Sequence, residues 1–469
     1  MTLQEEIKNG ESRTLEYKAE LPEDSSKWIK TIVAFANGAG GKFIVGVNNK
    51  REFIGIPKEV DLFELKDGIA DTIAQMCEPQ VVFDITAEII ENAQLLIIQV
   101  YPGNATPYYI KSQGLTDGTY IRLGATSRKA DWTTLEELKN RSRHIFYDEL
   151  PFQNLSVTEE DKKYLCKDFS ERAKRGITQK ELENLHLIIG GTKQTATNAY
   201  AILLGKHDYT SRIQCARFRG TERIEFMDKK DYEGPLCEQI DLAYKFVLNY
   251  LSMAIQINGI VHDEKYELPP QAIRELIINA AVHRNYQMSS SIQVAVYDDR
   301  VEISSPGSLY GTLTLEEALS GRSSIRNRTI ARTFEKIGIV EGWGSGLKRI
   351  IGMCEAYGVE PPQFMEIGDM LRVNFYRPSY KKTGDKSAIT ASIGDKSAIT
   401  TTTGDKPAVT EKEKIIAYLR LHPNAKSSEI ASLLGLKISR TKDYLSELVE
   451  EGTVITHGAN RNRTYSVQV

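Results

Sequence analysis

A decapeptide that occurs three times near the C-terminus divides this chain. Its copies start at Gly384, Gly394 and Gly404 and begin with GDKSAIT, GDKSAIT and GDKPAVT. Sequence this polar and Thr-rich cannot bury enough apolar surface to offset the entropy cost of ordering it. Three short, polar copies cannot form a solenoid either. We therefore predict a flexible linker over residues 379–410 and a separate domain over residues 411–469.

The composition is that of a folded, multidomain protein. The chain has 469 residues, 41% hydrophobic and 26% charged, and at about 150 residues per domain this length predicts about three domains. Lys and Arg number 60 against 63 Asp and Glu, a net charge of −3. The chain is not globally basic, so nucleic-acid binding would have to come from a local patch.

The five cysteines and the N-terminus predict a cytoplasmic location. The cysteines show none of the short Cys or Cys/His spacings of a zinc site or a disulfide framework. The first residues, MTLQEE, are acidic where a signal peptide is basic. The most apolar helical stretch, residues 246–261, is interrupted by polar side chains and is shorter than the ~20 residues of a membrane span. We expect a soluble protein without membrane contact.

Residues 1–145 show an α/β pattern. An apolar stripe predicts a helix from Ser25 or Ser26 to Ala36, and glycines then lead into a strand over residues 43–47. A helix over 62–77, strands over 81–90 and 95–101, and the segment 118–124 complete this predicted domain.

Glu16 and Lys18 share one face of a strand predicted from residue 13 to 18, because strand side chains alternate between the two faces. A carboxylate beside an ammonium suits a metal-dependent nuclease, in which the acid binds a divalent cation and the lysine polarises water or phosphate. A solvated charge pair on a strand surface gives the same pattern. These residues alone leave both interpretations open.

The wider sequence around this pair resembles the Schlafen-type AlbA-like domain. The resemblance rests on Glu11 to Ile56, including FANGAGGKFIVGV at 35–47, and on YIRLGATS at 120–127. It implies a nucleic-acid-binding domain. In nuclease-active Schlafen members two Glu join an Asp that follows the Gly-rich strand, so Glu11, Glu16 and Lys18 are the candidate nuclease residues. Here Asn48 and Asn49 follow that strand, and we favour binding over cleavage.

Residues 150–378 form the predicted middle region, and residues 150–260 carry no motif. The helix predicted over 271–283 places Glu275, Asn279 and His283 on one face, at steps of four residues. A site for a ligand and a solvated polar stripe both explain this spacing.

A strand pair over 291–297 and 300–304, Pro306-Gly307, and EGWGSGLKRII at 341–351 follow this helix. Alternating glycines before an apolar helix suit a phosphate cradle of backbone N–H groups, although close helix packing favours the same residues. This order of motifs over residues 269–358 resembles the Bergerat (GHKL-type) ATP-binding fold. The closer resemblance is to its divergent form in bacterial proteins described as transcriptional regulators or RecG-like helicases.

The resemblance implies ATP and Mg²⁺ as cofactors. By it, Asn279 holds the metal against the phosphates and Glu275 is the base or water-orienting residue. Ser305 stands where an Asp normally reads adenine, which leaves adenine selectivity open. The other residues implied to bind the nucleotide are His283, Gly307, Gly342, Gly344, Gly346 and Leu347.

Residues 411–469 predict a winged helix: helices over 414–421, 428–434 and 439–451, followed by a two-stranded hairpin. Basic and hydroxyl side chains gather at the start of the third helix and in the hairpin loop, where such domains meet phosphates and base edges. The candidate DNA-binding residues are Lys437, Ser439, Arg440, Thr441, Lys442, Arg461 and Arg463. A winged helix that contacts protein instead is the alternative.

These observations predict an α+β multidomain protein: a Schlafen AlbA-like α/β domain, a Bergerat-like α/β sandwich and a C-terminal winged helix. We expect a DNA-binding transcriptional regulator with an ATP-sensing domain, acting as a homo-oligomer on double-stranded DNA, with RNA and nucleotide as further partners. The alternative is a Schlafen-like nuclease that needs a metal, cuts RNA or DNA, and is gated by nucleotide. Any enzyme activity would be a weak ATPase or this nuclease.

Overall fold

The computed structural model separates the chain into two compact units, Met1–Asp385 and Lys386–Val469. It describes residues 2–191, 193–258, 261–340, 346–378, 415–416, 419, 425–434, 438–450, 452–458 and 463–467. The predicted linker over 379–410 lies outside the described residues. Within the described residues, no helix is both long enough and apolar enough to cross a membrane.

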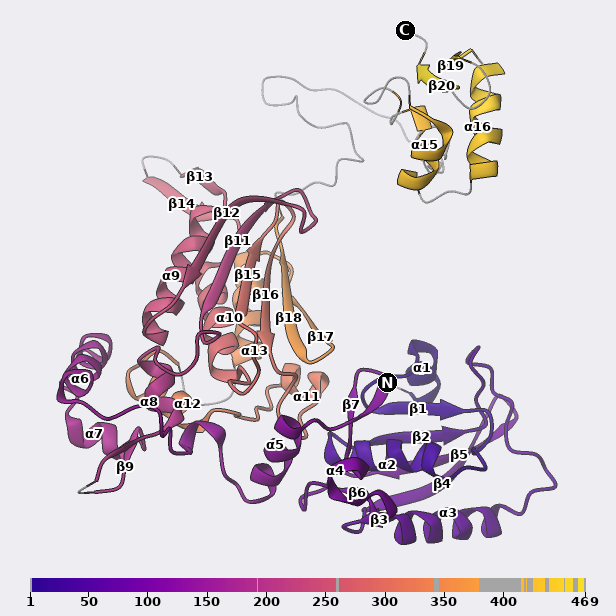
Figure 1. Cartoon of the computed structure of the whole chain (residues 1–469), viewed down its shortest axis with the longest axis horizontal. Coiled ribbons are helices and arrows are strands. Elements are labelled where there is room, and N and C mark those ends of the chain that lie inside the picture. The colour runs from indigo at the N-terminus through magenta and orange to yellow at the C-terminus, as the bar shows by residue number, and fades with distance from the viewer. Residues whose placement is uncertain are drawn as a thin grey trace. The chain divides into compact units, whose positions relative to one another are not determined.

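The first unit begins with a four-stranded sheet in the order β1-β2-β5-β4 (Figure 1). β1 (Leu15–Lys18) pairs in parallel with β2 (Gly41–Val45), and β5 (Ala93–Val100) runs antiparallel to both β2 and β4 (Phe83–Ile90). The pattern predicted for this region is therefore present.

Two helices cover this sheet because each carries an apolar stripe. The stripe of α2 (Ser26–Asn37), which includes Trp28 and Ile32, packs with Phe43 of β2. On the other face, Ile7 of α1 (Leu3–Asn9) packs with the β1 residues Leu15 and Tyr17. The remaining elements are α3 (Leu62–Met76), β3 (Cys77–Glu78), β6 (Tyr109–Ile110), η1 (Lys111–Gln113), α4 (Gly114–Gly118), β7 (Tyr120–Leu123), β8 (Thr126–Lys129), α5 (Trp132–Ser142) and η2 (Tyr147–Glu149).

The middle region is built on a six-stranded sheet in the order β12-β11-β15-β16-β18-β17. β11 and β15 are parallel, and every other neighbouring pair is antiparallel. The strands are β11 (Ile213–Arg219), β12 (Glu225–Tyr232), β15 (Ile292–Val296), β16 (Arg300–Pro306), β17 (Gln363–Ile367) and β18 (Met370–Tyr376). Residues 150–260, which show no motif, thus supply two strands, and the sheet extends beyond 269–358 in both directions.

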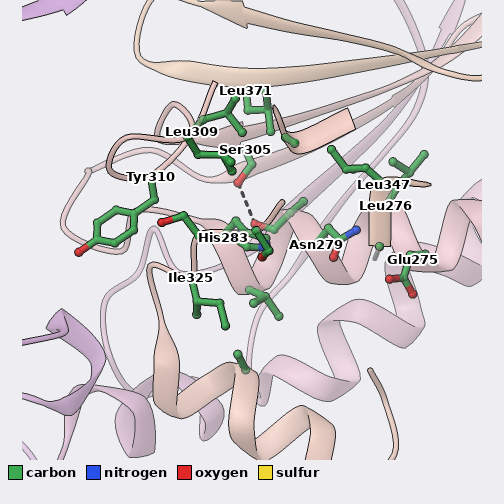
Figure 2. A pocket seen from close by; sticks show the side chains of 18 of the residues that line it. Glu275, Leu276, Asn279, His283, Ser305, Leu309, Tyr310, Ile325, Leu347 and Leu371 are labelled. Carbon is green, nitrogen blue, oxygen red and sulfur yellow. Dashed lines mark hydrogen bonds between the residues drawn. The ribbon is translucent and has the colours of Figure 1, made fainter. Parts of the chain in front are cut away.

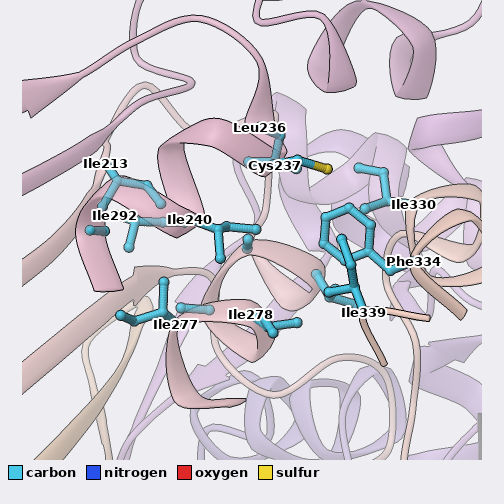
Figure 3. Packing of buried hydrophobic residues seen from close by; sticks show 14 of the residues in the cluster. Ile213, Leu236, Cys237, Ile240, Ile277, Ile278, Ile292, Ile330, Phe334 and Ile339 are labelled. Carbon is cyan, nitrogen blue, oxygen red and sulfur yellow. The ribbon is translucent and has the colours of Figure 1, made fainter. Parts of the chain in front are cut away.

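Helices pack on one face of this sheet (Figure 1). α10 (Pro270–His283) lies against β16 and beside α9 (Leu236–Asn249) and α13 (Gly346–Tyr357). Figure 3 shows Ile277 and Ile278 of α10 in the largest core cluster, together with Phe334 of α12 (Arg328–Lys336). This core anchors α10, so its polar face is held in a defined position.

The described part of the middle region contains eight further elements. They are α6 (Glu159–Ala173), α7 (Gln179–Asn184), β9 (Ile188–Ile189), β10 (Thr195–Ala196), α8 (Asn198–Leu203), β13 (Met253–Asn258), β14 (Val261–Tyr266) and α11 (Leu315–Ser320).

The second unit contains α15 (Ser427–Leu434), α16 (Ile438–Glu450) and a hairpin of β19 (Val454–His457) and β20 (Thr464–Val467). Ile415 and Leu419, which are helical, pack with Ile430 and Leu445 in its core. This arrangement agrees with the predicted winged helix. The turn around Gly435 lies outside the described residues.

Candidate functional site

The polar face of α10 borders a cavity. Glu275, Asn279 and His283 all line it, as their spacing predicts, while Ile273 and Ile277 on the other face are fully buried. Pro270 begins the helix, where its missing N–H costs nothing. Because α10 is packed into the core, its three polar residues enter the cavity from a rigid wall (Figure 2).

The cavity has a volume of about 190 Å³. Its walls come from α10, β16 and the loop that follows it, α11, α12, the start of α13, β17 and β18. Apolar side chains form much of the lining, and they include Leu276, Ile303, Leu309, Ile325, Leu347, Phe364, Leu371 and Val373. A largely apolar pocket with a few polar groups is typical of a small-molecule site.

The start of α13 lies directly against Glu275 and Asn279. A Cβ atom at Gly346 would be 3.2 Å from both Glu275 Oε1 and Asn279 Nδ2, so a larger residue would crowd both side chains. Arg349, one turn further, donates to Glu275 Oε2 at 2.7 Å, and the Glu275 side chain is only 6% exposed. The predicted phosphate-cradle glycines Gly342 and Gly344 lie outside the described residues.

Ser305 and Gly307 occupy the end of β16 beside the cavity. The Ser305 hydroxyl donates to the Ala280 carbonyl oxygen at 2.8 Å (Figure 2). Its proton is therefore used within the protein, and its oxygen can still accept a hydrogen bond. Gly307 has φ +100°, and a side chain there would collide with Arg326. Glycine is needed at this position both for its backbone conformation and for space.

His283 presents a neutral imidazole to the cavity. Burial, and secondarily the positive charge of Arg326, lower the pKa of His283 to about 4. Arg326 also donates to the His283 carbonyl oxygen at 2.9 Å. At neutral pH the ring therefore offers one donor and one acceptor, and it carries no charge that would attract a phosphate.

Several cavity residues are of the types that nucleotide sites use. Asn279 supplies an amide oxygen of the type that binds Mg²⁺, Glu275 a carboxylate beside it, and Ser305 an acceptor near the apolar wall. Gly346 brings an unobstructed backbone to Glu275 and Asn279.

A second polar cluster lies on β1. Leu15 and Tyr17 are buried, so Glu16 and Lys18 face the other way, as predicted. Lys18 Nζ is 2.7 Å from Glu16 Oε1 and 3.1 Å from Glu11 Oε1. Burial opposes the charge on Lys18, but its bonds to the two carboxylates outweigh burial and raise the lysine pKa. The three candidate nuclease residues are therefore brought together.

Arg122 of β7 is the residue that sequence reasoning missed in this cluster. Its side chain is 2% exposed and contacts Glu16 Oε2 at 2.7 Å. It also donates to the carbonyl oxygens of Ser12 at 2.6 Å and Leu15 at 3.3 Å. The motif YIRLGATS contains this arginine, and a charged residue inside a short apolar strand was the available signal.

Asn48 and Asn49 do not extend this cluster. Asn48 donates to Glu52 and accepts from the backbone of Lys50 and Glu52, so its amide serves its own turn. Asn49 is exposed. Among the described residues, no group of three or more His, Cys, Asp or Glu is arranged to hold a metal ion.

In the second unit, Lys442 of α16 and Arg463 before β20 are exposed. Thr441 is fully buried, so its prediction as a DNA contact is wrong: its side chain packs inside the domain. Ser439 and Arg440 lie in α16, but their side chains are outside what the structure describes, as are Lys437 and Arg461 altogether.

Comparison with family models assigns three parts of the chain. Residues 11–131 match "Schlafen, AlbA_2", residues 289–375 match "Putative ATP-dependent DNA helicase recG C-terminal", and residues 412–455 match "Winged helix-turn-helix DNA-binding". The chain carries these three domains. The cavity is shared by residues of the RecG-C-terminal-type domain and by α10, which precedes the matched range, whereas the β1 cluster belongs to the Schlafen AlbA_2 domain.

Two solved structures are similar to the chain. The DIP2311 protein from Corynebacterium diphtheriae is 20% identical over 97% of this chain and 88% of its own, with a TM-score of 0.43. The N-terminal domain of a "Putative ATP-dependent DNA Helicase RecG-related Protein" from Nitrosomonas europaea is 24% identical over 28% of this chain and 91% of its own, with a TM-score of 0.21. Comparison with curated proteins gives no match.

Proposed function

We propose that this chain is a DNA-binding transcriptional regulator whose middle domain senses ATP. The observation that carries the proposal is the match of residues 412–455 to a winged-helix DNA-binding model, in a domain whose α16 exposes Lys442. A regulator also needs a site for a signal, and the cavity beside α10 supplies one. The acidic overall charge agrees with DNA contact through this local surface rather than through the whole molecule.

In this proposal the residues of the nucleotide site have separate roles. The Asn279 amide oxygen binds Mg²⁺, and the backbone of Gly342, Gly344 and Gly346 holds the phosphates. Ser305 accepts a hydrogen bond from the base, while His283, Gly307 and Leu347 shape the pocket around it. Bound Mg-ATP would supply a cleavable phosphoanhydride.

Glu275 decides whether the site senses or hydrolyses ATP. Its Oε2 already accepts from Arg349 at 2.7 Å, so this oxygen is engaged within the protein rather than held toward an attacking water. We therefore expect a sensor with feeble ATPase activity at most.

Duplex binding by variants of α16 tests the DNA-binding part of the proposal. Arg440→Ala and Lys442→Ala should each weaken binding and make the dependence of log affinity on log salt shallower by about one unit, because each removes one phosphate contact. Fluorescence anisotropy with a labelled duplex measures both quantities. The control is Arg175→Ala, which removes an exposed arginine paired with Glu181 in the first unit. Unchanged slopes in both α16 variants would move DNA binding to the Schlafen AlbA_2 domain.

A metal-dependent nuclease is the second candidate, favoured by the convergence of Glu11, Glu16 and Lys18. Against it, two cations already occupy the oxygens of Glu16. We expect no cleavage when labelled RNA, single-stranded DNA and duplex DNA are incubated with the chain and Mg²⁺ or Mn²⁺. Cleavage that Glu16→Ala abolishes would establish the nuclease. Cleavage gained only in Asn48→Asp or Asn49→Asp would mark a decayed one.

A further inference from the structure

The loop after β16 has two sides. On its inner side, Gly307, Ser308, Leu309 and Tyr310 line the cavity. On its outer side, the Leu309 N–H donates to Glu366 Oε1 at 3.0 Å. A ligand that fills the cavity must press against this loop, so any change in the loop is passed to the groups that hold its outer side.

Arg13 of the Schlafen AlbA_2 domain is one of these groups. Its guanidinium contacts Glu366 Oε1 at 2.7 Å and the Leu309 carbonyl oxygen at 3.4 Å. The side chains of Arg13 and Glu366 are only 17% and 19% exposed. A partly buried, charge-assisted contact of this kind is stronger than a surface ion pair. The backbone of a cavity wall is thus held by a residue 296 positions away in the chain.

The segment that carries Arg13 also belongs to the β1 cluster. Arg122 donates to the carbonyl oxygens of Ser12 and Leu15, on both sides of Arg13, while its other terminal nitrogen contacts Glu16. Glu16 in turn contacts Lys18. Polar contacts therefore lead from the cavity wall to Arg13. The backbone from Arg13 to the nearby Ser12 and Leu15 continues this path to Arg122, which contacts Glu16.

A second connection reaches the same loop through α5. Arg141 donates to the carbonyl oxygen of Asn37, at the end of α2, at 2.7 Å, and its side chain passes beside Gly311. Glu137 pairs with Arg326 at 3.3 Å, and Arg326 donates to the Ser308 carbonyl oxygen at 3.1 Å. Two separate parts of the N-terminal region thus hold one loop.

We infer that the cavity and the β1 cluster are coupled: a ligand in the cavity changes the state of residues 11–18 through the loop at 307–311 and Arg13, and any ligand bound at the cluster changes affinity in the cavity by the same factor. This inference rests on the proposed ligand site. The reciprocity follows from linkage, since one coupling free energy serves both sites. The physical element that both sites bias is the loop.

Hydrogen exchange on the full chain tests the coupling. Mg²⁺ with a non-hydrolysable ATP analogue should change the exchange rates of amides in residues 12–18 by about fivefold or more. Arg13→Ala should remove this response. Glu366→Gln should reduce it too, because an amide oxygen can still accept from Leu309 N–H but no longer pairs with the guanidinium. Arg175→Ala, which removes an arginine–glutamate pair on α6 and α7, should respond like the parent.

The outcomes separate the coupling from the ligand site itself. If the analogue neither raises the melting temperature nor changes exchange around Asn279, the proposed nucleotide function fails. In that case Ala331→Leu replaces the ligand, because Ala331 lines the cavity and a larger side chain there fills part of it. Hydrogen exchange of residues 12–18 is then compared between this variant and the parent. If an occupied or filled cavity leaves residues 12–18 unchanged, or if Arg13→Ala responds like the parent, the coupling is refuted.

Discussion

Replacement of Arg122 by alanine should destabilise the Schlafen AlbA_2 domain by about 3–5 kcal/mol. The guanidinium is 2% exposed and pairs with a Glu16 side chain that is 12% exposed. Removal of one partner from a buried pair leaves an uncompensated charge, which typically costs about 3–5 kcal/mol. Lys18 still contacts Glu16, which favours the lower end. The carbonyl oxygens of Ser12 and Leu15 also lose a donor, which favours the upper end.

Lys18→Met is the matched comparison. The lysine side chain is 37% exposed, so its ion pairs are screened by solvent and contribute at most about 1 kcal/mol. If Arg122 is the structural centre of the cluster, Arg122→Ala should lower the free energy of unfolding several times more than Lys18→Met does. If the cluster instead depends on Lys18, as in a nuclease centre built around this lysine, Lys18→Met should cause the larger loss of stability.

Urea unfolding followed by Trp28 fluorescence measures the effect. Trp28 is 2% exposed and lies on α2, inside this domain. The chain has three tryptophans, so Trp132→Phe and Trp343→Phe make Trp28 the single reporter. With a slope of about 1.5 kcal/mol per molar urea, a loss of about 3 kcal/mol lowers the midpoint by about 2 M. A midpoint shift below about 0.5 M for Arg122→Ala, or a larger shift for Lys18→Met than for Arg122→Ala, would show that Arg122 is not the residue that stabilises this cluster.

Two further predictions concern the middle region and Asp148, which contacts Ile330 in it. Mg-ATP should raise the melting temperature by mass action, and Asn279→Ala should abolish this rise. The control Asn184→Ala, at an exposed position on α7, should keep it. A rise that survives Asn279→Ala would place the ligand elsewhere. Two titratable groups, His283 and Asp148, should give opposite pH dependence. The pKa of His283 is lowered from 6.5 to about 4, so its contribution is full above pH 6.5 and is lost as the pH falls toward 4. This contribution to the free energy of unfolding is about 3 kcal/mol at most. His283→Gln should make the free energy of unfolding depend less on pH between about 4 and 6.5. Burial raises the pKa of Asp148, whose carboxylate accepts from the Ile330 N–H, to about 7. The folded state therefore favours the protonated acid. Stability should fall by about 4 kcal/mol at most as the pH rises from about 4 to about 7, and Asp148→Asn should remove this fall. Urea unfolding at a series of pH values measures both effects. If a variant and the parent show the same dependence of unfolding free energy on pH, the pKa assigned to that residue is wrong.

The elements that the sequence predicted well are those with a clear period. α2 and α10 carry apolar stripes, and β1 alternates strictly, so local spacing was sufficient to orient Glu16, Lys18, Glu275, Asn279 and His283. Burial of one face decides which way the other face points, and both faces are readable from a short window of residues.

The contacts that escaped prediction join distant segments. Arg122 meets Glu16 across 106 positions, and Arg13 meets Leu309 across 296. Short-range periodicity contains no information on such pairs. The strands β11 and β12 were missed for a related reason: they carry no recognisable motif, and their place is set by the parallel pairing of β11 with β15.

Thr441 shows a prediction that a closer reading of period would have corrected. Thr441, Leu445 and Leu448 are spaced by four and three residues, and all three are buried. This spacing places them on one helix face, so the face that buries two leucines also buries the threonine. A prediction based only on which basic and hydroxyl residues lie near the start of a helix cannot separate its buried face from its exposed face.

The most direct test of the proposed function is the duplex DNA affinity of the full chain, measured by anisotropy with and without Mg²⁺ and a non-hydrolysable ATP analogue. The duplex should be selected by the chain from a random-sequence library, because the target sequence is not readable from the protein. We predict that the analogue changes the dissociation constant by about fivefold or more and that Asn279→Ala removes this change without loss of DNA binding. Tight duplex binding that the analogue leaves unchanged, or no duplex binding at all, would contradict an ATP-sensing DNA-binding regulator.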